Sequence, residues 1–187
     1  VGCTRVVLTD PRDPAAPLPF EVSCAAALDR SIIDPARLPR ERIAEISRLA
    51  VHRDYRRRRG EEHTPVHIDS SDFSDGDRPR FPFVPTSLLL GAVALADCSG
   101  IDTVFVLTEP RLAAHFTKLG VEVIQIGQAI EHRGRRIPSV MHVDEIIRNM
   151  RPILHPLWQR VRAEIGRGFE EAGRGKGQQG LPTTHNG

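Results

Sequence analysis

Short runs of apolar and β-branched residues predict four strands along this chain. Each run ends at turn residues such as Asp-Pro or Gly, which favour a change of direction. The predicted strands cover residues 2–9, 43–51, 102–108 and 121–126. The run at 102–108 shows no polar alternation, which is typical of a strand with both faces covered.

Helical patterns separate these strands. Residues 85–97 are apolar nearly all round, which is typical of a buried helix, and Thr86 is its expected N-cap. A second helix is expected over residues 109–119, because Pro110 suits a first helical turn and Gly120 suits a helix end.

The C-terminal third predicts a hairpin and a broken helix. Residues 128–143 fit a hairpin that turns at 133–134, and residues 144–166 fit a helix interrupted near Pro152 and Pro156. The order of all these elements predicts an α/β fold with a mixed sheet and no internal repeat.

Long irregular segments divide the chain. Residues 52–84 form a connection rich in Pro, Asp and Ser, and such long loops are commonly functional or disordered. Residues 166–187 contain seven glycines and few apolar residues, which predicts a disordered tail. We therefore assign residues 1–165 to one domain.

Composition narrows the class of protein. The chain has 187 residues and a formal charge of only +2, so no overall field favours nucleic acid. No apolar run of about 18 residues predicts a membrane span, and no signal peptide is visible. Three cysteines without Cys-x-x-Cys spacing fit a reducing compartment, so we expect a cytoplasmic protein. The first residue is Val, which indicates either an alternative start codon or a fragment.

Glu45 and Arg48 place a carboxylate and a guanidinium three residues apart at the start of an apolar run. Residues three apart on a regular strand point to opposite faces. They can share one cleft only if the strand carries a bulge or the sheet splays there. One interpretation is a structural ion pair, and the other is a base beside a clamp for an anion or a carbonyl.

A run of arginines follows that strand. Five guanidiniums, at Arg53 and at 56–59, lie within seven residues and are followed by Gly60. They could form an exposed loop that pairs with the acidic segment at 61–80. Alternatively, arginine forks and backbone N–H groups could converge on a phosphate.

Metal binding is not expected. His63 and His67 are four residues apart with Asp69 nearby, but Pro65 prevents the helix that would align them. The acidic residues at 69–75 lack the alternate spacing of a calcium loop.

Several of these motifs resemble GNAT-type acyltransferases. The sequence Arg-Arg-Arg-Gly at 57–60 resembles part of their pyrophosphate loop, and Phe-Thr-Lys-Leu-Gly at 116–120 resembles a late helix end. The pattern Glu-x-Ser-Arg-Leu-x-Val at 45–51 is similar to a hallmark of the autoinducer-synthase and N-acyl amino acid synthase branch. The pattern Gly-x-x-Arg-Val at 2–6 resembles the strand that precedes it.

The nearest resemblance is to the acyltransferases associated with the PEP-CTERM/exosortase system in bacteria. The shared features are Ser-Arg-Leu-Ala-Val at 47–51, the arginine run at 56–59 and Gly-Arg-Arg-Ile-Pro at 134–138. The resemblance covers about residues 1–165. It implies a GNAT-like mixed, centrally splayed sheet flanked by helices, without the family's opening helices and first strand.

The resemblance also implies an acyl donor. Glu62 stands where the phosphate loop usually has a second small residue, and its carboxylate opposes a nucleotide pyrophosphate. An acyl carrier protein, which presents one phosphodiester on an acidic surface, suits the arginines better than coenzyme A. We expect no tightly bound cofactor, and acyl carrier protein or acyl-CoA as the co-substrate. The donor site would comprise Leu49, Ala50, Val51, Arg56, Arg57, Arg58, Arg59 and Gly60.

The implied reaction is attack of a small amine on the thioester. Glu45 would accept the amine proton, while Arg48 and Arg5 would hold the acceptor's carboxylate or lock Glu45 in place. Backbone N–H groups around 49–51 would stabilise the oxyanion. The usual phenolic general acid is absent, because its place is taken by Phe116. Residues 88–96 and 104–107 could wall an acyl tunnel or form plain core.

Two alternatives remain open at the level of sequence. One is a non-catalytic module that binds acyl carrier protein or lipid. The other is an acyl-homoserine-lactone synthase that uses S-adenosylmethionine.

Overall fold

The structure is a computed structural model that describes residues 2–52, 83–132 and 134–178. Its strands form one mixed sheet in the order β1-β2-β3-β6-β4, with β5 paired to β6. The β2–β3 pair is parallel and the other pairs are antiparallel. The strand bounds are β1 Gly2–Leu8, β2 Ile43–Val51, β3 Thr103–Thr108, β4 Ile124–Gln125, β5 Ile130–Glu131 and β6 Arg135–His142.

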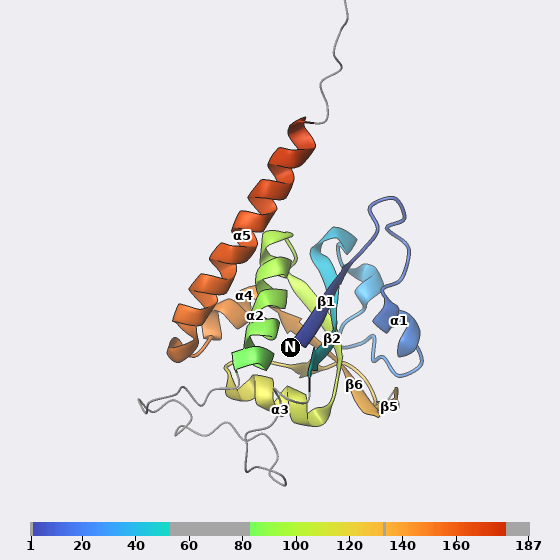
Figure 1. The fold of residues 1–187 in the computed structure, drawn as a ribbon. Coiled ribbons are helices and arrows are strands. Elements are labelled where there is room, and N and C mark those ends of the chain that lie inside the picture. Colours follow the sequence, from blue (N-terminus) through green and yellow to red (C-terminus); the bar gives the residue numbers. More distant parts are fainter. Residues whose placement is uncertain (1, 53–82, 133, 179–187) are drawn as a thin grey trace, which may run out of the picture.

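Helices cover both faces of this sheet (Figure 1). The long helices α2 and α5 pack on one face with α4, and the short helix α1 lies on the other. The helix bounds are α1 Pro19–Ser23, α2 Phe83–Cys98, α3 Pro110–Lys118, α4 Val143–Asn149 and α5 His155–Gln178, with 3₁₀ turns η1 Pro35–Arg37, η2 Arg40–Arg42 and η5 Pro152–Leu154. The expected mixed α/β sheet flanked by helices is confirmed.

Strand alternation divides the core into two clusters. Ala44, Ile46 and Val104 face α2 and α5, whereas Ile43 and Phe105 face α1. This follows from the two-residue period of a strand, since neighbouring side chains point to opposite faces. Both faces of β2 and β3 are therefore buried near their starts, as the continuous apolar runs predict.

The sheet opens between β2 and β3. These strands pair only over the first three residues of each, from Ile43↔Thr103 to Glu45↔Phe105. Beyond that point β2 pairs only with β1, while β3 continues along β6 as far as Thr108↔Ile137. The predicted central splay is present, and it begins at Glu45.

Two sequence expectations need correction. Thr86 is not an N-cap, because α2 begins at Phe83 and Thr86 is therefore a residue within the helix. Thr86 is also buried. The segment beyond residue 165 is not disordered throughout, because α5 continues to Gln178. The first turns of α5 pack Trp158 and Val161 against the core. Packing of these turns nucleates the helix and outweighs the low helix propensity of the glycines that follow.

The predicted strand at 121–126 is shorter than expected. Its first residues are used to end α3, since the Val121 N–H donates to the Phe116 carbonyl. Strand β4 pairs with β6 at Ile124 and Gln125, and the Ile126 N–H donates to the Pro138 carbonyl of β6 at 2.9 Å. Within the described part of the chain, no helix has both the length and the apolar character needed to cross a bilayer.

Candidate active site

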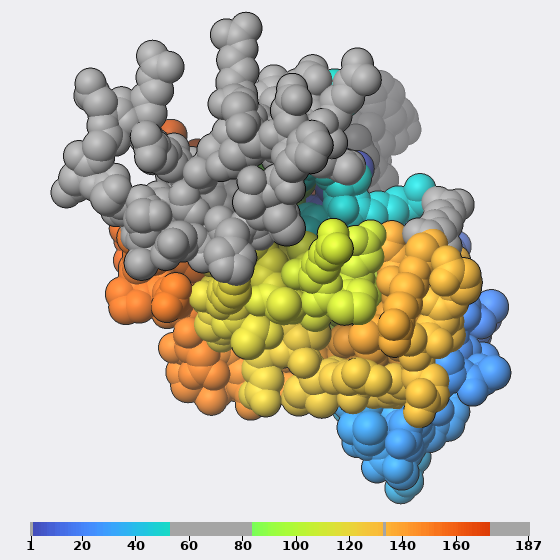
Figure 2. All heavy atoms as spheres, turned by 90° about the horizontal axis from the view of Figure 1, so that it is seen from below, coloured from blue at the N-terminus to red at the C-terminus, as the bar shows by residue number. Residues whose placement is uncertain are grey.

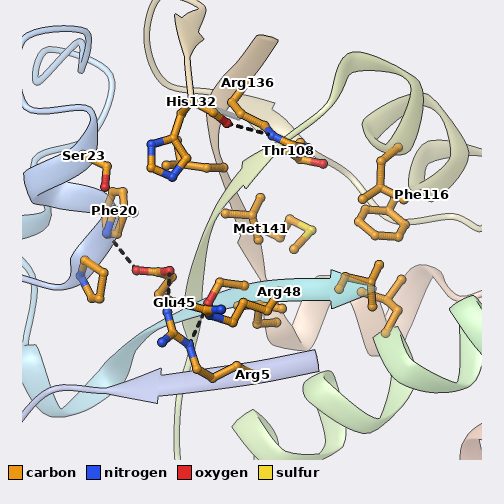
Figure 3. Close-up of a pocket in the computed structure, with 18 residues that line it drawn as sticks. Arg5, Phe20, Ser23, Glu45, Arg48, Thr108, Phe116, His132, Arg136 and Met141 are labelled. Carbon is orange, nitrogen blue, oxygen red and sulfur yellow. Dashed lines mark hydrogen bonds and ion pairs between the residues drawn. The ribbon is translucent and has the colours of Figure 1, made fainter. Parts of the chain in front are cut away.

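The opening between β2 and β3 holds a cavity of about 410 Å³ (Figure 3). From below, the start of α3 (yellow-green), the end of β2 (cyan) and the β5–β6 hairpin (light orange) lie next to one another on one face (Figure 2). Its lining residues come from nearly every element around the opening: Arg5, Pro19, Phe20, Ser23, Glu45, Ile46, Ser47, Arg48, Leu49, Leu89, Val106, Leu107, Thr108, Leu112, Phe116, His132, Arg136 and Met141.

A bulge in β2 explains how Glu45 and Arg48 reach one cavity. The β1–β2 register runs from Arg5↔Ser47 to Cys3↔Ala50. Between these two pairs β2 advances by three residues and β1 by two, so β2 has one extra residue. Arg48 takes the extra position with φ of 55°, in the left-handed region. A bulged residue of this kind turns the strand and re-aims its side chains. The sequence required a bulge or a splay for Glu45 and Arg48 to share one cleft, and the structure has this bulge.

Arg48 offers a direct test of the bulge. A left-handed backbone strains a non-glycine residue, and it strains a β-branched residue most. We expect Arg48→Val to lower the free energy of unfolding by about 1–3 kcal/mol. Arg48→Gly should stay within about 1 kcal/mol of wild type, because relief of strain offsets the entropy cost of glycine. Urea unfolding of both variants checks this. Equal stability of the two variants would show that the bulge imposes no strain.

Glu45 is buried beside the bulge, with only 6% of the residue exposed. Its Oε2 accepts a 2.7 Å hydrogen bond from the Phe20 N–H, and its Oε1 lies 3.7 Å from Arg5 Nη2. Arg5 Nε in turn donates to Ser47 Oγ at 3.1 Å. Among the described residues the ion-pair partner of Glu45 is thus Arg5, and the direct pair with Arg48 is not formed. Two contacts hold the carboxylate in one orientation.

A second cationic wall faces Glu45 from the hairpin. Arg136 Nη1 lies 2.7 Å from Glu109 Oε1, and Arg136 Nε donates to the His132 carbonyl at 3.4 Å. The His132 ring also lines the cavity (Figure 3). Arg136 belongs to the Gly-Arg-Arg-Ile-Pro motif at 134–138, which was noted in the sequence without a site role. Pairing of β6 with β3 carries it to the opening.

The remaining wall of the cavity is apolar. It includes Leu49 from β2, Leu89 from α2, Leu112 and Phe116 from α3, and Met141 from β6. From the apolar segments 88–96 and 104–107, Leu89, Val106 and Leu107 line the cavity. Leu89 and Val106 belong to the packed core as well.

Cys24 lies close to this site but is not a nucleophile. Burial, and after it the negative charges of Glu45 and Glu21, raise the pKa of the Cys24 thiol to about 11. The thiol is therefore protonated at neutral pH, and only thiolates attack readily. It donates instead to the Phe20 carbonyl at 2.8 Å, which adds one more contact to α1.

The predicted site residues divide into three groups. Glu45, Arg5, Arg48 and Leu49 line the cavity. Ala50 and Val51 are not among its lining residues, and they pair with Cys3 and Gly2 of β1. The third group, Arg56, Arg57, Arg58, Arg59 and Gly60, lies outside the described residues. So do His63, His67 and Asp69, at which no metal site was expected.

Sequence reasoning missed the Phe20 N–H, His132 and Arg136. A main-chain donor carries no residue-type signal.

In the described ranges no group of three or more His, Cys, Asp or Glu side chains is placed to hold a metal ion.

Comparison with known proteins finds no matching family model and no matching curated protein. Similar solved structures include BjaI, a CoA-dependent acyl-homoserine lactone synthase with SAM and isopentyl-CoA, at 17% identity and a TM-score of 0.49 over 89% of this chain and 59% of that one. MesI, another CoA-dependent acyl-homoserine lactone synthase, matches at 20% identity and a TM-score of 0.45 over 89% and 63%. The apo form of TofI matches at 17% identity and a TM-score of 0.45 over 76% and 59%. The chain spans about three fifths of the length of these structures.

Proposed function

We propose that this protein is an acyltransferase. It moves a fatty acyl group from a carrier-protein thioester to the amine of a small metabolite that bears a carboxylate, as an amino acid does. One observation carries this proposal: a buried, oriented carboxylate, Glu45, lies at the splay of a sheet, between cationic side chains and an apolar wall. The carboxylate can accept the proton of an amine, the cations can bind a carboxylate, and the apolar wall can contact an acyl chain.

Glu45 acts as the base. The amine nitrogen attacks the thioester carbon, the C–N bond forms, and the C–S bond breaks as the thiolate leaves. The amine proton passes to Glu45 directly or through water, and the thiolate takes a proton from solvent. The Phe20 N–H contacts one carboxylate oxygen and Arg5 lies near the other, so the orientation of the Glu45 carboxylate in the cavity is fixed.

Cations on two walls select the acceptor. Arg5 and Arg48 approach from the β1–β2 side and Arg136 from the hairpin, whereas Glu45 is the buried carboxylate that faces them. Guanidinium forks bind carboxylates in a bidentate manner. An amine that carries a carboxylate therefore fits this cavity better than a simple alkylamine.

The apolar wall accommodates the acyl chain. Leu49, Leu89, Leu112, Phe116 and Met141 offer it a surface without buried polar groups to leave unpaired. Main-chain N–H groups at the bulge, next to Leu49, stabilise the oxyanion. The arginines at 56–59 contribute to donor binding by contacting the carrier protein's phosphodiester, an assignment that rests on the sequence alone.

Mass spectrometry of extracts from an expressing strain tests the proposal. We expect N-acylated amino acids with wild type and none with Glu45→Gln produced at the same level. Acyl-homoserine lactones in the wild-type extract would identify a lactone synthase instead. Acyl carrier protein retained on the immobilised protein, with no acylated product in any extract, would identify a binding module.

A further inference from the structure

We infer that Arg40 is a positioning residue for the proposed base Glu45, although it does not line the cavity. This inference rests on the proposed function. Arg40 lies in η2, just before β2, and only 14% of its side chain is exposed. It holds the segment before α1 and the Glu21 side chain of α1. The first turn of α1 supplies the main-chain N–H, that of Phe20, which orients Glu45.

Arg40 joins separate stretches of irregular chain through one guanidinium. Its Nε donates to the Pro14 carbonyl at 3.2 Å, its Nη2 to the Ala16 carbonyl at 2.8 Å, and its Nη1 to the Pro35 carbonyl at 3.3 Å. The Glu21 carboxylate accepts two more bonds, at 2.9 and 3.2 Å. A rigid guanidinium fork suits several acceptors at once in a way that an ammonium does not.

Glu21 passes this constraint to the start of α1. It is 8% exposed, and its Oε2 also accepts a 2.7 Å hydrogen bond from the Leu18 N–H. Leu18 is the N-cap of α1, so the carboxylate closes the first turn. A helix of five residues does not form by itself, because nucleation costs more than so few bonds return. Its position therefore depends on anchors such as Arg40.

Phe20 connects the anchored turn to the base. Its N–H donates to Glu45 Oε2 at 2.7 Å (Figure 3). Its ring stacks on Phe105 with centroids 4.5 Å apart. If the turn shifts, the N–H moves with it and the carboxylate loses its orientation. Displacements of about 1 Å at a reacting group can cost about 100-fold in rate.

A purely structural role for the Arg40–Glu21 pair is the competing explanation. Breaking a buried ion pair leaves an uncompensated charge and destabilises any protein. Such destabilisation would lower activity whether or not Glu45 is present. A positioning role acts through Glu45 alone, so the two explanations differ once the base has been removed.

A double-mutant cycle separates these explanations. Arg40→Met is measured in wild type and in Glu45→Gln, with acyl carrier protein thioester as donor. We expect kcat to fall by about 10–100-fold in the wild-type background, with the donor KM within about twofold. In the Glu45→Gln background it should fall by less than about twofold, since the base is already lost.

Arg42→Met is the matched control. Arg42 also lies in η2 and also forms an ion pair, but its partner Asp102 is on the exposed surface and neither residue lines the cavity. We expect kcat unchanged within about twofold in both backgrounds, since exposed pairs contribute little. If Arg40→Met does not fold at the assay temperature, Arg40→Lys replaces it, with a smaller loss in wild type and the same absence of further loss in Glu45→Gln.

Hydrogen exchange gives a readout that does not depend on activity. Arg40→Met should remove the protection of the Phe20 amide, and Arg42→Met should leave it in place. Equal losses of kcat in both backgrounds, or no loss in either, would overturn the inference. A different result would contradict the proposed function: Glu45→Gln would retain wild-type turnover, whatever the effect of Arg40→Met.

Discussion

Replacing Glu45 by Gln is expected to slow acyl transfer by about 10²–10⁴-fold while the protein stays folded. Glutamine has the same shape, and its carbonyl oxygen can still accept the Phe20 N–H bond that Glu45 accepts at 2.7 Å. What it loses is the ability to take the amine proton. Steady-state release of free thiol from acyl carrier protein measures the loss, with far-UV circular dichroism to verify folding.

Glu41→Gln is the control for that substitution. Glu41 is the preceding acidic residue along the chain, exposed and outside the cavity. It should retain activity within about twofold, as expected for a surface change away from the site. If Glu45→Gln were as active as Glu41→Gln, Glu45 would not be the base, and its burial would have only a structural meaning.

Phe105→Ala is expected to cause a large loss of stability, about 3–5 kcal/mol in the free energy of unfolding. Phe105 is fully buried at the point where β2 and β3 still pair, and its ring stacks on Phe20. Truncation therefore leaves a cavity between β3 and α1 and removes an aromatic contact. Urea unfolding followed by the fluorescence of Trp158, the single tryptophan, measures the change.

Phe169→Ala provides the matched comparison for Phe105. Phe169 lies on α5 and is 40% exposed, so its truncation should change stability by less than about 1 kcal/mol. A loss below about 1 kcal/mol for Phe105→Ala as well would mean that the face covered by α1 is not a packed core.

Much of the fold follows from local patterns. The bounds of β2 are those predicted, because a mostly apolar run that ends before a polar segment specifies a strand. The end of α3 at Gly120 was also predictable. Gly120 has a φ of 89°, and a Cβ there would lie 2.2 Å from the Asn149 carbonyl oxygen, so no larger residue fits.

The sequence could predict the site residues, but it could predict their meeting in one cleft only if the strand bulged or the sheet splayed. The sequence identifies Glu45 and Arg48 and requires a bulge or a splay to bring them together, but nothing local places that bulge. It arises from the register between β1 and β2, two segments about 40 residues apart. The same pairing makes Arg5 the partner of Glu45, a choice that spacing within one strand cannot reveal.

Other parts of the site depend on contacts that have no sequence signal. The Phe20 N–H reaches Glu45 because Arg40 and Glu21 fix the first turn of α1. Arg40 does so partly through main-chain carbonyls that any residue could supply. Arg136 enters the cavity because the β5–β6 hairpin pairs back along β3. The helical continuation of α5 was missed for a related reason, since packing of its first turns outweighs the low helix propensity of glycine.

The most direct test of acyl transfer at this cavity measures free thiol released from acyl carrier protein by the purified protein, with and without a panel of amino acids. The account predicts release that depends on the amino acid, matched mole for mole by N-acylated product, and reduced by about 10²–10⁴-fold in Glu45→Gln. Release that is absent with every amino acid, or equal in wild type and Glu45→Gln, would contradict it.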